Sequence, residues 1–447
     1  MKKDNHFFKN VCSLAIPVAL QSMLQSSFSI VDQIMIGQLG STNIAGVGLA
    51  GKFSSIYTVV VSAIGAVAGI MVSQYMGQKN GKEVKRSFYL NLFMGLCLAI
   101  IFTMMCAIFP VQIMGLYTKD MPTRLAAANY LAIIAGTFIP VAGATMLSTM
   151  FRCMEKASLP LYASIAAALV NTVLNYILIF GKFGFPTMGA TGVAVATVIS
   201  QLVNLVIMLF MYVKCKKPLE WKQSEEASTG KFRWGQYAGI LLPILVCEFM
   251  WSLGENIYAA IYGHMGTDAS AAMTLINPVQ GLMIGALCGL SQAASVIIGK
   301  KLGVGEYDEA YEASKKLIYY GFIGSAVLSI VILFISPYYV KIFQVEEHVR
   351  ALTKQILLAY ALIASFKVEN MIVGGGIIRS GGKTKYVLAI DMIGTWGFGV
   401  PLGLLAAFVC KLSIPHVYFI LSLEECVRFA ISLVVLRRRK WMQQLEA

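Results

Sequence analysis

Long apolar segments recur along this chain of 447 residues and constrain its fold more than any other feature. A helix that crosses a bilayer needs about 20 mostly apolar residues, because each residue rises about 1.5 Å and the hydrocarbon core is about 30 Å thick. Twelve segments meet this requirement, which predicts an all-α integral membrane protein with twelve transmembrane helices. They are residues 11–37, 44–76, 87–109, 125–149, 158–180, 190–213, 237–263, 268–299, 314–336, 350–378, 385–409 and 413–436.

The composition agrees with a membrane protein. Hydrophobic residues make up 57% of the chain and charged residues 13%, against roughly 45–50% and about 25% in ordinary globular proteins. A soluble chain of this length could not cover its surface with so few charges. The first apolar run continues to Gly37 without an obvious cleavage site, so it predicts a retained helix rather than a signal peptide.

Lys and Arg gather in alternate connections between the predicted helices. One side of the membrane holds 26 of them and the other side 7. Because cytoplasmic loops collect Lys and Arg, both termini are predicted to be cytoplasmic, in an inner or plasma membrane. The net charge of +14 therefore reflects the membrane topology of the chain, and we expect no nucleic-acid partner.

The two halves of the chain resemble each other. Pro17 and Gly37 recur 226 residues later as Pro243 and Gly263. Six helices per half give both halves one orientation, so we expect a pseudo-symmetry axis along the membrane normal and a central cleft. The predicted parts are an N-terminal six-helix lobe at 1–213, a cytoplasmic linker at 214–236 and a C-terminal six-helix lobe with a cytoplasmic tail at 237–447.

Asp32 is the only acid well inside a predicted span of the N-terminal half. Insertion of an ionisable group at that depth in the membrane costs at least about 2.5–3.5 kcal/mol, so we expect Asp32 to have a specific role. One interpretation is a protonatable or cation-binding carboxylate, as an ion-coupled exchanger requires. The other is a carboxylate at the outer interface or one paired with Lys52.

Asn171 and Asn175 are four residues apart, which places both amides on one face of the fifth predicted helix. They could offer oxygens to a hard cation or hydrogen-bond Asp32. The alternative is ordinary amide hydrogen bonding between helices in lipid.

The C-terminal half carries more acids within its predicted spans. These acids could hold Na⁺ or relay a proton, or could be neutralised by Lys367 and Arg428. Glu424 and Glu425 resemble partners of Arg428 within one helix. The ion-coupling candidates here are Glu255 and Glu369, and the candidates that line a substrate cavity are Gln33, Glu248, Asn256, Asn370 and Asp391.

Four stretches together resemble the multidrug and toxic compound extrusion (MATE) family: residues 31–50, 171–200, 261–272 and 377–396. The resemblance implies two six-helix lobes around a V-shaped cavity, and export of organic cations in exchange for Na⁺ or H⁺ by alternating access. It also implies that Asp32 is a cation-coupling residue with Asn171 and Asn175 beside it. Na⁺-coupled relatives carry acids on the seventh and tenth helices, for which Glu255 and Glu369 are the candidates.

Many relatives have Asp where this chain has Asn175, so the N-terminal lobe has one carboxylate fewer. This difference weakens the case for a simple H⁺ relay and leaves room for Na⁺. We expect a monomer in the bilayer with no cofactor and no metal other than transient Na⁺. Because no nucleophile–base or metal constellation is visible, we do not expect an enzyme. The alternative function is a flippase of the same superfamily for a lipid-linked or polar lipid substrate.

Overall fold

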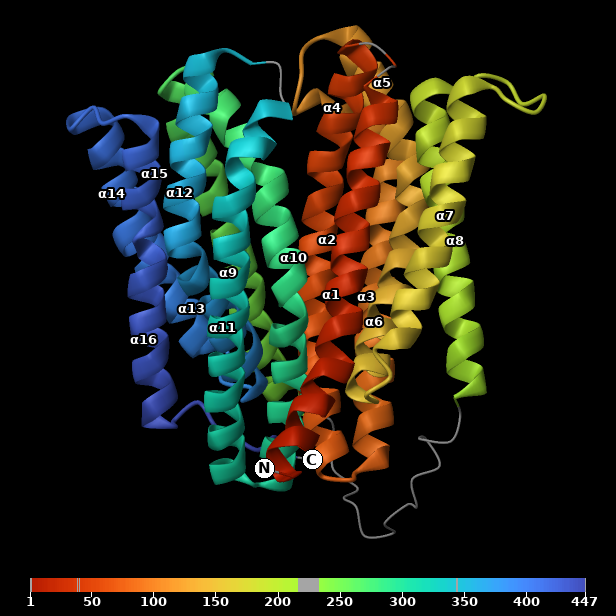
Figure 1. Ribbon diagram of the computed structural model, residues 1–447. Coiled ribbons are helices and arrows are strands. Elements are labelled where there is room, and N and C mark those ends of the chain that lie inside the picture. The colour runs from red at the N-terminus through yellow and green to blue at the C-terminus, as the bar shows by residue number, and fades with distance from the viewer. Residues whose placement is uncertain (1, 38, 40, 216–232, 343–344, 447) are drawn as a thin grey trace. The chain divides into compact units, whose positions relative to one another are not determined.

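The computed structural model describes residues 2–37, 39, 41–215, 233–342 and 345–446, and within these ranges every regular element is a helix. Most of the predicted linker at 214–236 lies outside the described residues. Figure 1 shows the long helices running side by side within each half of the chain. They are α1 (Lys2–Ile36), α2 (Ser41–Gly77), α3 (Gly81–Ile108), α4 (Pro110–Gly115), α5 (Met121–Ile134), α6 (Phe138–Cys153), α7 (Ser158–Phe180), α8 (Gly189–Lys214), α9 (Trp234–His264), α10 (Thr267–Val304), α11 (Tyr307–Tyr339), α12 (Glu347–Asn370), α13 (Lys385–Asp391), α14 (Val400–Leu404), α15 (Ile414–Ser422) and α16 (Glu424–Arg438).

Eleven helical segments of the described chain are long and apolar enough to cross a membrane, and they correspond to the first eleven predicted spans. The fourth is one segment from Met121 to Cys153, in which the 3₁₀ turn η1 (Ala135–Thr137) joins α5 to α6. The tenth and eleventh contain π-helical stretches: η4 (Met371–Ile378), η5 (Met392–Gly399) and η6 (Leu405–Val409). The predicted all-α membrane fold is thus confirmed.

The twelfth predicted span, 413–436, is not one continuous helix. It consists of α15 and α16, between which the single residue Leu423 keeps helical dihedral angles but donates its amide to Ile420, three residues earlier. Two acids, Glu424 and Glu425, open α16 directly after this residue. Each of the two pieces is therefore too short to cross a bilayer alone, and together they complete the twelve-helix set.

Contacts divide the chain into two compact units. Unit 1 comprises residues 1–19, 73–78 and 229–447, and unit 2 comprises residues 20–72 and 79–228. Within unit 2, α7 packs along α8 and α3 along α6; within unit 1, α12 packs against α11 and α10. The two predicted lobes fall largely into separate units, although the first turns of α1 and the end of α2 group with the C-terminal half. That 1–213 and 237–447 act as two lobes stays a prediction.

The end of α2 crosses α10 at very short range inside unit 1. A side chain at Gly303 would collide with the carbonyl oxygen of Gln74, and one at Gly77 would collide with that of Lys300. Glycines are required here because only a residue without Cβ lets two helix backbones approach so closely.

The C-terminal tail after α16 is part of the packed core of unit 1. The side chain of Trp441 is 0% exposed and that of Leu445 is 3% exposed. Gln74 accepts a hydrogen bond of 2.8 Å from the amide of Leu445, and Gln444 donates one of 2.6 Å to the carbonyl of Gly303. The tail therefore covers the crossing of α2 and α10, and its start is on the same side of the unit as the start of α1 (Figure 1).

Candidate functional site

In unit 2, Asp32 on α1 lies against α7. The amide nitrogen of Asn175 donates a hydrogen bond of 2.7 Å to Oδ1 of Asp32. The amide of Asn171 lies 3.0 Å from the same oxygen, and its NH₂ faces the carboxylate in the orientation that pairs donors with acceptors. The hydrogen bond to Asp32, one of the alternatives that the sequence left open for these two amides, is thus present. Asp32 is not paired with Lys52, whose side chain is exposed.

The far side of this cluster is also polar. The Asn171 amide lies 3.4 Å from the hydroxyl of Thr197 and 3.5 Å from that of Ser200, both on α8. Asn175 is 0% exposed, and its Oδ1 has no hydrogen-bond partner among the described residues. A carboxylate with neighbouring amide oxygens is a ligand set suited to a hard cation. The unpartnered oxygen supplies an acceptor for such an ion or for a water molecule.

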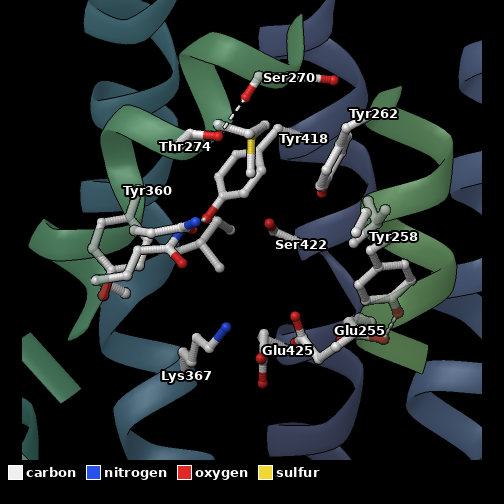
Figure 2. Close-up of a pocket in the computed structure, with 18 residues that line it drawn as sticks. Glu255, Tyr258, Tyr262, Ser270, Thr274, Tyr360, Lys367, Tyr418, Ser422 and Glu425 are labelled. Atoms are coloured by element: carbon white, nitrogen blue, oxygen red, sulfur yellow. Dashed lines mark hydrogen bonds between the residues drawn. The ribbon is translucent and has the colours of Figure 1, made fainter. Parts of the chain in front are cut away.

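Unit 1 contains a cavity of about 390 Å³, which we call the tyrosine cavity (Figure 2). Its walls come from α9, α10, α12, α15 and α16, and the rings of four tyrosines border it: Tyr258, Tyr262, Tyr360 and Tyr418. Three acids and one base line it as well: Glu255, Glu424, Glu425 and Lys367. The volume and the aromatic walls are typical of small-molecule sites.

A second cavity of about 240 Å³ shares Lys367 and Glu425 with the tyrosine cavity. Its other charged side chains form ion pairs. Arg379 binds Glu248 at 3.1 Å, and Arg428 pairs with Asp391 and lies 3.3 Å from Glu425. Pairing of this kind offsets the cost of placing charge inside a membrane protein.

Several of these contacts distinguish between the roles that the sequence left open for the acids of the C-terminal half. Arg428 neutralises Asp391 and Glu425, as one alternative held. Glu424 instead accepts a hydrogen bond of 2.5 Å from the hydroxyl of Tyr258. Asn370 donates a bond of 2.8 Å to Glu425. Asn370 and Asp391 each directly precede a π-helical stretch, a feature that is frequent at functional sites.

The other predicted residues lie apart from these clusters. Glu369 lines neither cavity; it is 0% exposed, packs toward Gly321, and neither oxygen has a described hydrogen-bond partner. Gln33 is exposed. Asn256 is exposed too and donates only to the carbonyl of Ser252 in its own helix.

Sequence reasoning missed the tyrosines, and it treated Lys367 only as a possible counter-charge. Tyr258 and Tyr262 are four residues apart on α9, a spacing that places them on one helix face. From that spacing, the sequence alone could have predicted that these two tyrosines lie together. Nothing local indicates that Tyr360 and Tyr418, from two other helices, face the same cavity.

The repeated architecture and the cavities can be compared with known proteins. The sequence profile of the MatE family matches this chain twice, at residues 17–177 and 243–405. The two matches begin 226 residues apart, which is the offset of the internal repeat. The chain belongs to the MatE family.

Curated MatE-like relatives match over nearly the whole length. The chain is 25% identical to the probable multidrug resistance protein YoeA of Bacillus subtilis, over 97% of this chain and 94% of the relative. It is 22% identical to the probable multidrug resistance protein NorM of Thermotoga maritima, over 97% and 93%. A crystal structure of a variant of the Vibrio cholerae MATE transporter VcmN has a TM-score of 0.88 at 16% identity and covers 98% of each chain. The fold is thus that of MATE transporters, with twelve helices in two pseudo-symmetric halves.

Proposed function

We propose that this chain is a secondary active multidrug efflux transporter, which exports organic cations in exchange for Na⁺ or H⁺ by alternating access. Family membership and the names of YoeA and NorM support multidrug export. The observation that carries ion coupling is the contact between Asp32 and Asn175, because it holds a carboxylate at a defined place in unit 2.

The coupling residues that we propose are Asp32, Asn171 and Asn175 in unit 2, with Glu255 and Glu369 in unit 1. Among the described residues, Asp32 contacts two amides and no cationic side chain, so its negative charge is available to an ion. Glu369 is buried, and neither of its oxygens has a hydrogen-bond partner among the described residues, so both can accept from a proton donor or bind a cation. Glu255 lines the tyrosine cavity, where it can exchange with solvent or substrate.

The energetics favour more than one coupling ion. Export of a monovalent cation against a hundredfold gradient and 100 mV costs about 5.1 kcal/mol, whereas one coupling cation that enters down a tenfold gradient returns about 3.7 kcal/mol. Two coupling cations suffice. Ion-binding carboxylates in both units fit this requirement.

In this proposal the substrate binds in the tyrosine cavity and in the second cavity, which is lined by Glu248, Asn370 and Asp391. Gln33 and Asn256 are retained as candidates because both are exposed side chains on helices that carry the coupling acids. The lobes act as the two rocking halves. The protein works as a monomer in the plasma membrane with both termini in the cytoplasm, and it needs no cofactor.

Export of ethidium from proteoliposomes tests the proposal. An imposed Na⁺ gradient and an imposed pH gradient are compared for the wild type and for Asp32→Asn. We expect export under one of the two gradients and its loss in Asp32→Asn. Full uphill export by the variant would remove Asp32 from the mechanism. Export under neither gradient would favour the flippase alternative, which a lipid-scrambling assay then tests.

A further inference from the structure

Five basic side chains of unit 1 gather where α13 begins and α16 ends. All five are exposed, and none forms an ion pair within the described ranges of the chain. The ammonium of Lys383 donates a hydrogen bond of 3.0 Å to the backbone carbonyl of Lys440, which brings the two helix ends together. We call this set the basic patch: Lys383, Lys385, Arg437, Arg438 and Lys440.

Other basic residues of the same unit have acidic partners. Where α10 ends, Lys301 lies 2.5 Å from Glu309, and on α11 Lys315 lies 2.8 Å from Glu312. The general excess of Lys and Arg in predicted cytoplasmic connections accounts for bases at both places. It does not account for the acids that accompany only the bases of α10 and α11. The basic patch is therefore an uncompensated positive surface, which attracts anions.

The patch borders surfaces that face lipid. On α16, Arg438 follows Val434, which is 50% exposed, at a spacing of four. On α13, Lys385 is followed at the same spacing by Ala389 and then by Ile393, which is 45% exposed. This spacing places each set on one exposed helix face. Because exposed apolar side chains of a spanning helix contact lipid chains, the basic end of each face lies at the depth of the headgroups.

The start of α9 gives the same depth for the loop before α13. The hydroxyl of Thr384 in this loop donates a hydrogen bond of 3.0 Å to the carbonyl of Ile240 on α9. Six residues earlier, α9 begins at Trp234, which is 59% exposed. Tryptophan is enriched at the interface between membrane and water. The loop that carries Lys383 and Lys385 thus lies within reach of lipid phosphates.

We propose that the basic patch binds the headgroup of an anionic phospholipid, whose acyl chains lie along the exposed faces of α13 and α16. The two helices pack against each other, so one lipid can contact both (Figure 1). Arg437 and Arg438 can hold phosphate oxygens in pairs, and the lysines act as point charges. This inference goes beyond the proposed export function and does not depend on it.

The number of charges points to the kind of headgroup. Five positive charges exceed what one phosphate neutralises, so cardiolipin, with two phosphates, should bind more tightly than phosphatidylglycerol, with one. Phosphatidylcholine has no net charge and should bind weakly. A soluble anion would contact the basic side chains but not the neighbouring apolar faces.

Photo-crosslinking tests where the lipid binds. The full chain is reconstituted in phosphatidylcholine vesicles with a small share of phosphatidylglycerol that carries a diazirine near its headgroup, and labelled peptides are identified by mass spectrometry. The reference is the exposed face of α11 at Lys315, Tyr319 and Ile323, which has the same spacing but a paired lysine. We expect labelling around Ile393 and Val434 to exceed that of the reference face about tenfold, as one or two basic residues at about 1 kcal/mol each would give.

Variants assign the binding to the patch. Lys385→Gln/Arg438→Gln removes two charges and leaves the contact between the helix ends intact. We expect the affinity for cardiolipin, measured by native mass spectrometry in detergent micelles, to fall about 30-fold, which corresponds to two basic residues at about 1 kcal/mol each. Lys385→Arg/Arg438→Lys keeps both charges and should keep the affinity. Lys301→Gln/Lys315→Gln is the matched control, because it removes two lysines that already have acidic partners, and it should change the affinity less than about twofold.

The outcomes separate a lipid from other anions. Competition of cardiolipin, but not of phosphatidylcholine, with the labelling of α13 and α16 would support the inference. Equal labelling of the patch and the α11 face in the wild type, or an unchanged cardiolipin affinity in Lys385→Gln/Arg438→Gln, would overturn it. Inorganic phosphate that suppresses the labelling as well as cardiolipin does would assign the patch to a soluble anion and overturn the lipid as its occupant. If the double variant does not fold, the wild-type comparison of the two faces decides. None of these measurements depends on export.

Discussion

Asn175 on α7 donates a hydrogen bond of 2.7 Å to the carboxylate of Asp32 on α1, a residue 143 positions earlier in the chain. The bond orients the one acid of this cluster and fixes α1 against α7. It also leaves the amide oxygen of Asn175 buried next to the carboxylate, with no hydrogen-bond partner in the described part of the chain. The two side chains thus form a fixed set of possible cation ligands, in which Oδ1 of Asn175 can still accept a contact.

Replacement of Asn175 by Leu removes this orientation at similar volume. A hydrogen bond to a charged group contributes about 1.5–3 kcal/mol. We therefore expect the initial rate of ethidium export from proteoliposomes to fall about tenfold or more at limiting ion concentration. Asn43→Leu is the control because the amide of Asn43 donates only to the carbonyl of Leu39, four residues earlier in the chain. A wild-type rate in Asn175→Leu would contradict the assigned role.

Arg428→Met tests the ion pairs of the second cavity. The change leaves Asp391 and Glu425 without their cation, and loss of one partner of a buried pair costs about 3–5 kcal/mol. We expect the free energy of unfolding in mixed micelles to fall by that amount. The double variant Arg428→Met/Asp391→Asn should recover part of the loss. Lys315→Met breaks an exposed pair with Glu312 and should cost about 0–1 kcal/mol.

Gly303→Ala tests the crossing of α2 and α10. Its new Cβ collides with the carbonyl of Gln74, so we expect a loss of about 1–3 kcal/mol and a lower denaturation temperature in detergent. Gly281→Ala lies on the same helix with no atom within 4 Å of the new Cβ, and it should be neutral or slightly stabilising. Equal effects of the two changes would show that the crossing is looser than described.

Trp441→Ala tests the docking of the C-terminal tail. Truncation of a fully buried tryptophan costs about 3–5 kcal/mol. We expect limited proteolysis to cut the tail of the variant much faster than that of the wild type. Gln443→Ala removes a neighbouring exposed side chain and should leave the cleavage rate unchanged. Slow cleavage of Trp441→Ala would mean that the hydrogen bonds of Gln74 and Gln444 hold the tail without the tryptophan.

Local patterns predicted the helices, because hydrophobic runs and their lengths depend only on neighbours in the chain. The same reasoning placed Asn171 and Asn175 on one face of α7. It did not predict the interruption at Leu423. The acids that follow this residue on α16 have their partners on α9 and α12, which are distant in the sequence. Local reasoning also could not show that Glu369 and Asn370, which are adjacent in the chain, have side chains in different surroundings.

The sequence by itself determined the class of the protein: twelve apolar helices, the twofold repeat and the acid of α1 all follow from composition and spacing. Only the tertiary structure decided which charges are paired. Arg428 and Arg379 meet acids from other helices, whereas Lys367 and Glu255 line one cavity and form no ion pair within the described ranges. The physical reason is that electrostatic pairing acts over a few ångströms in space, and residues far apart in the chain reach that distance only after the helices have packed.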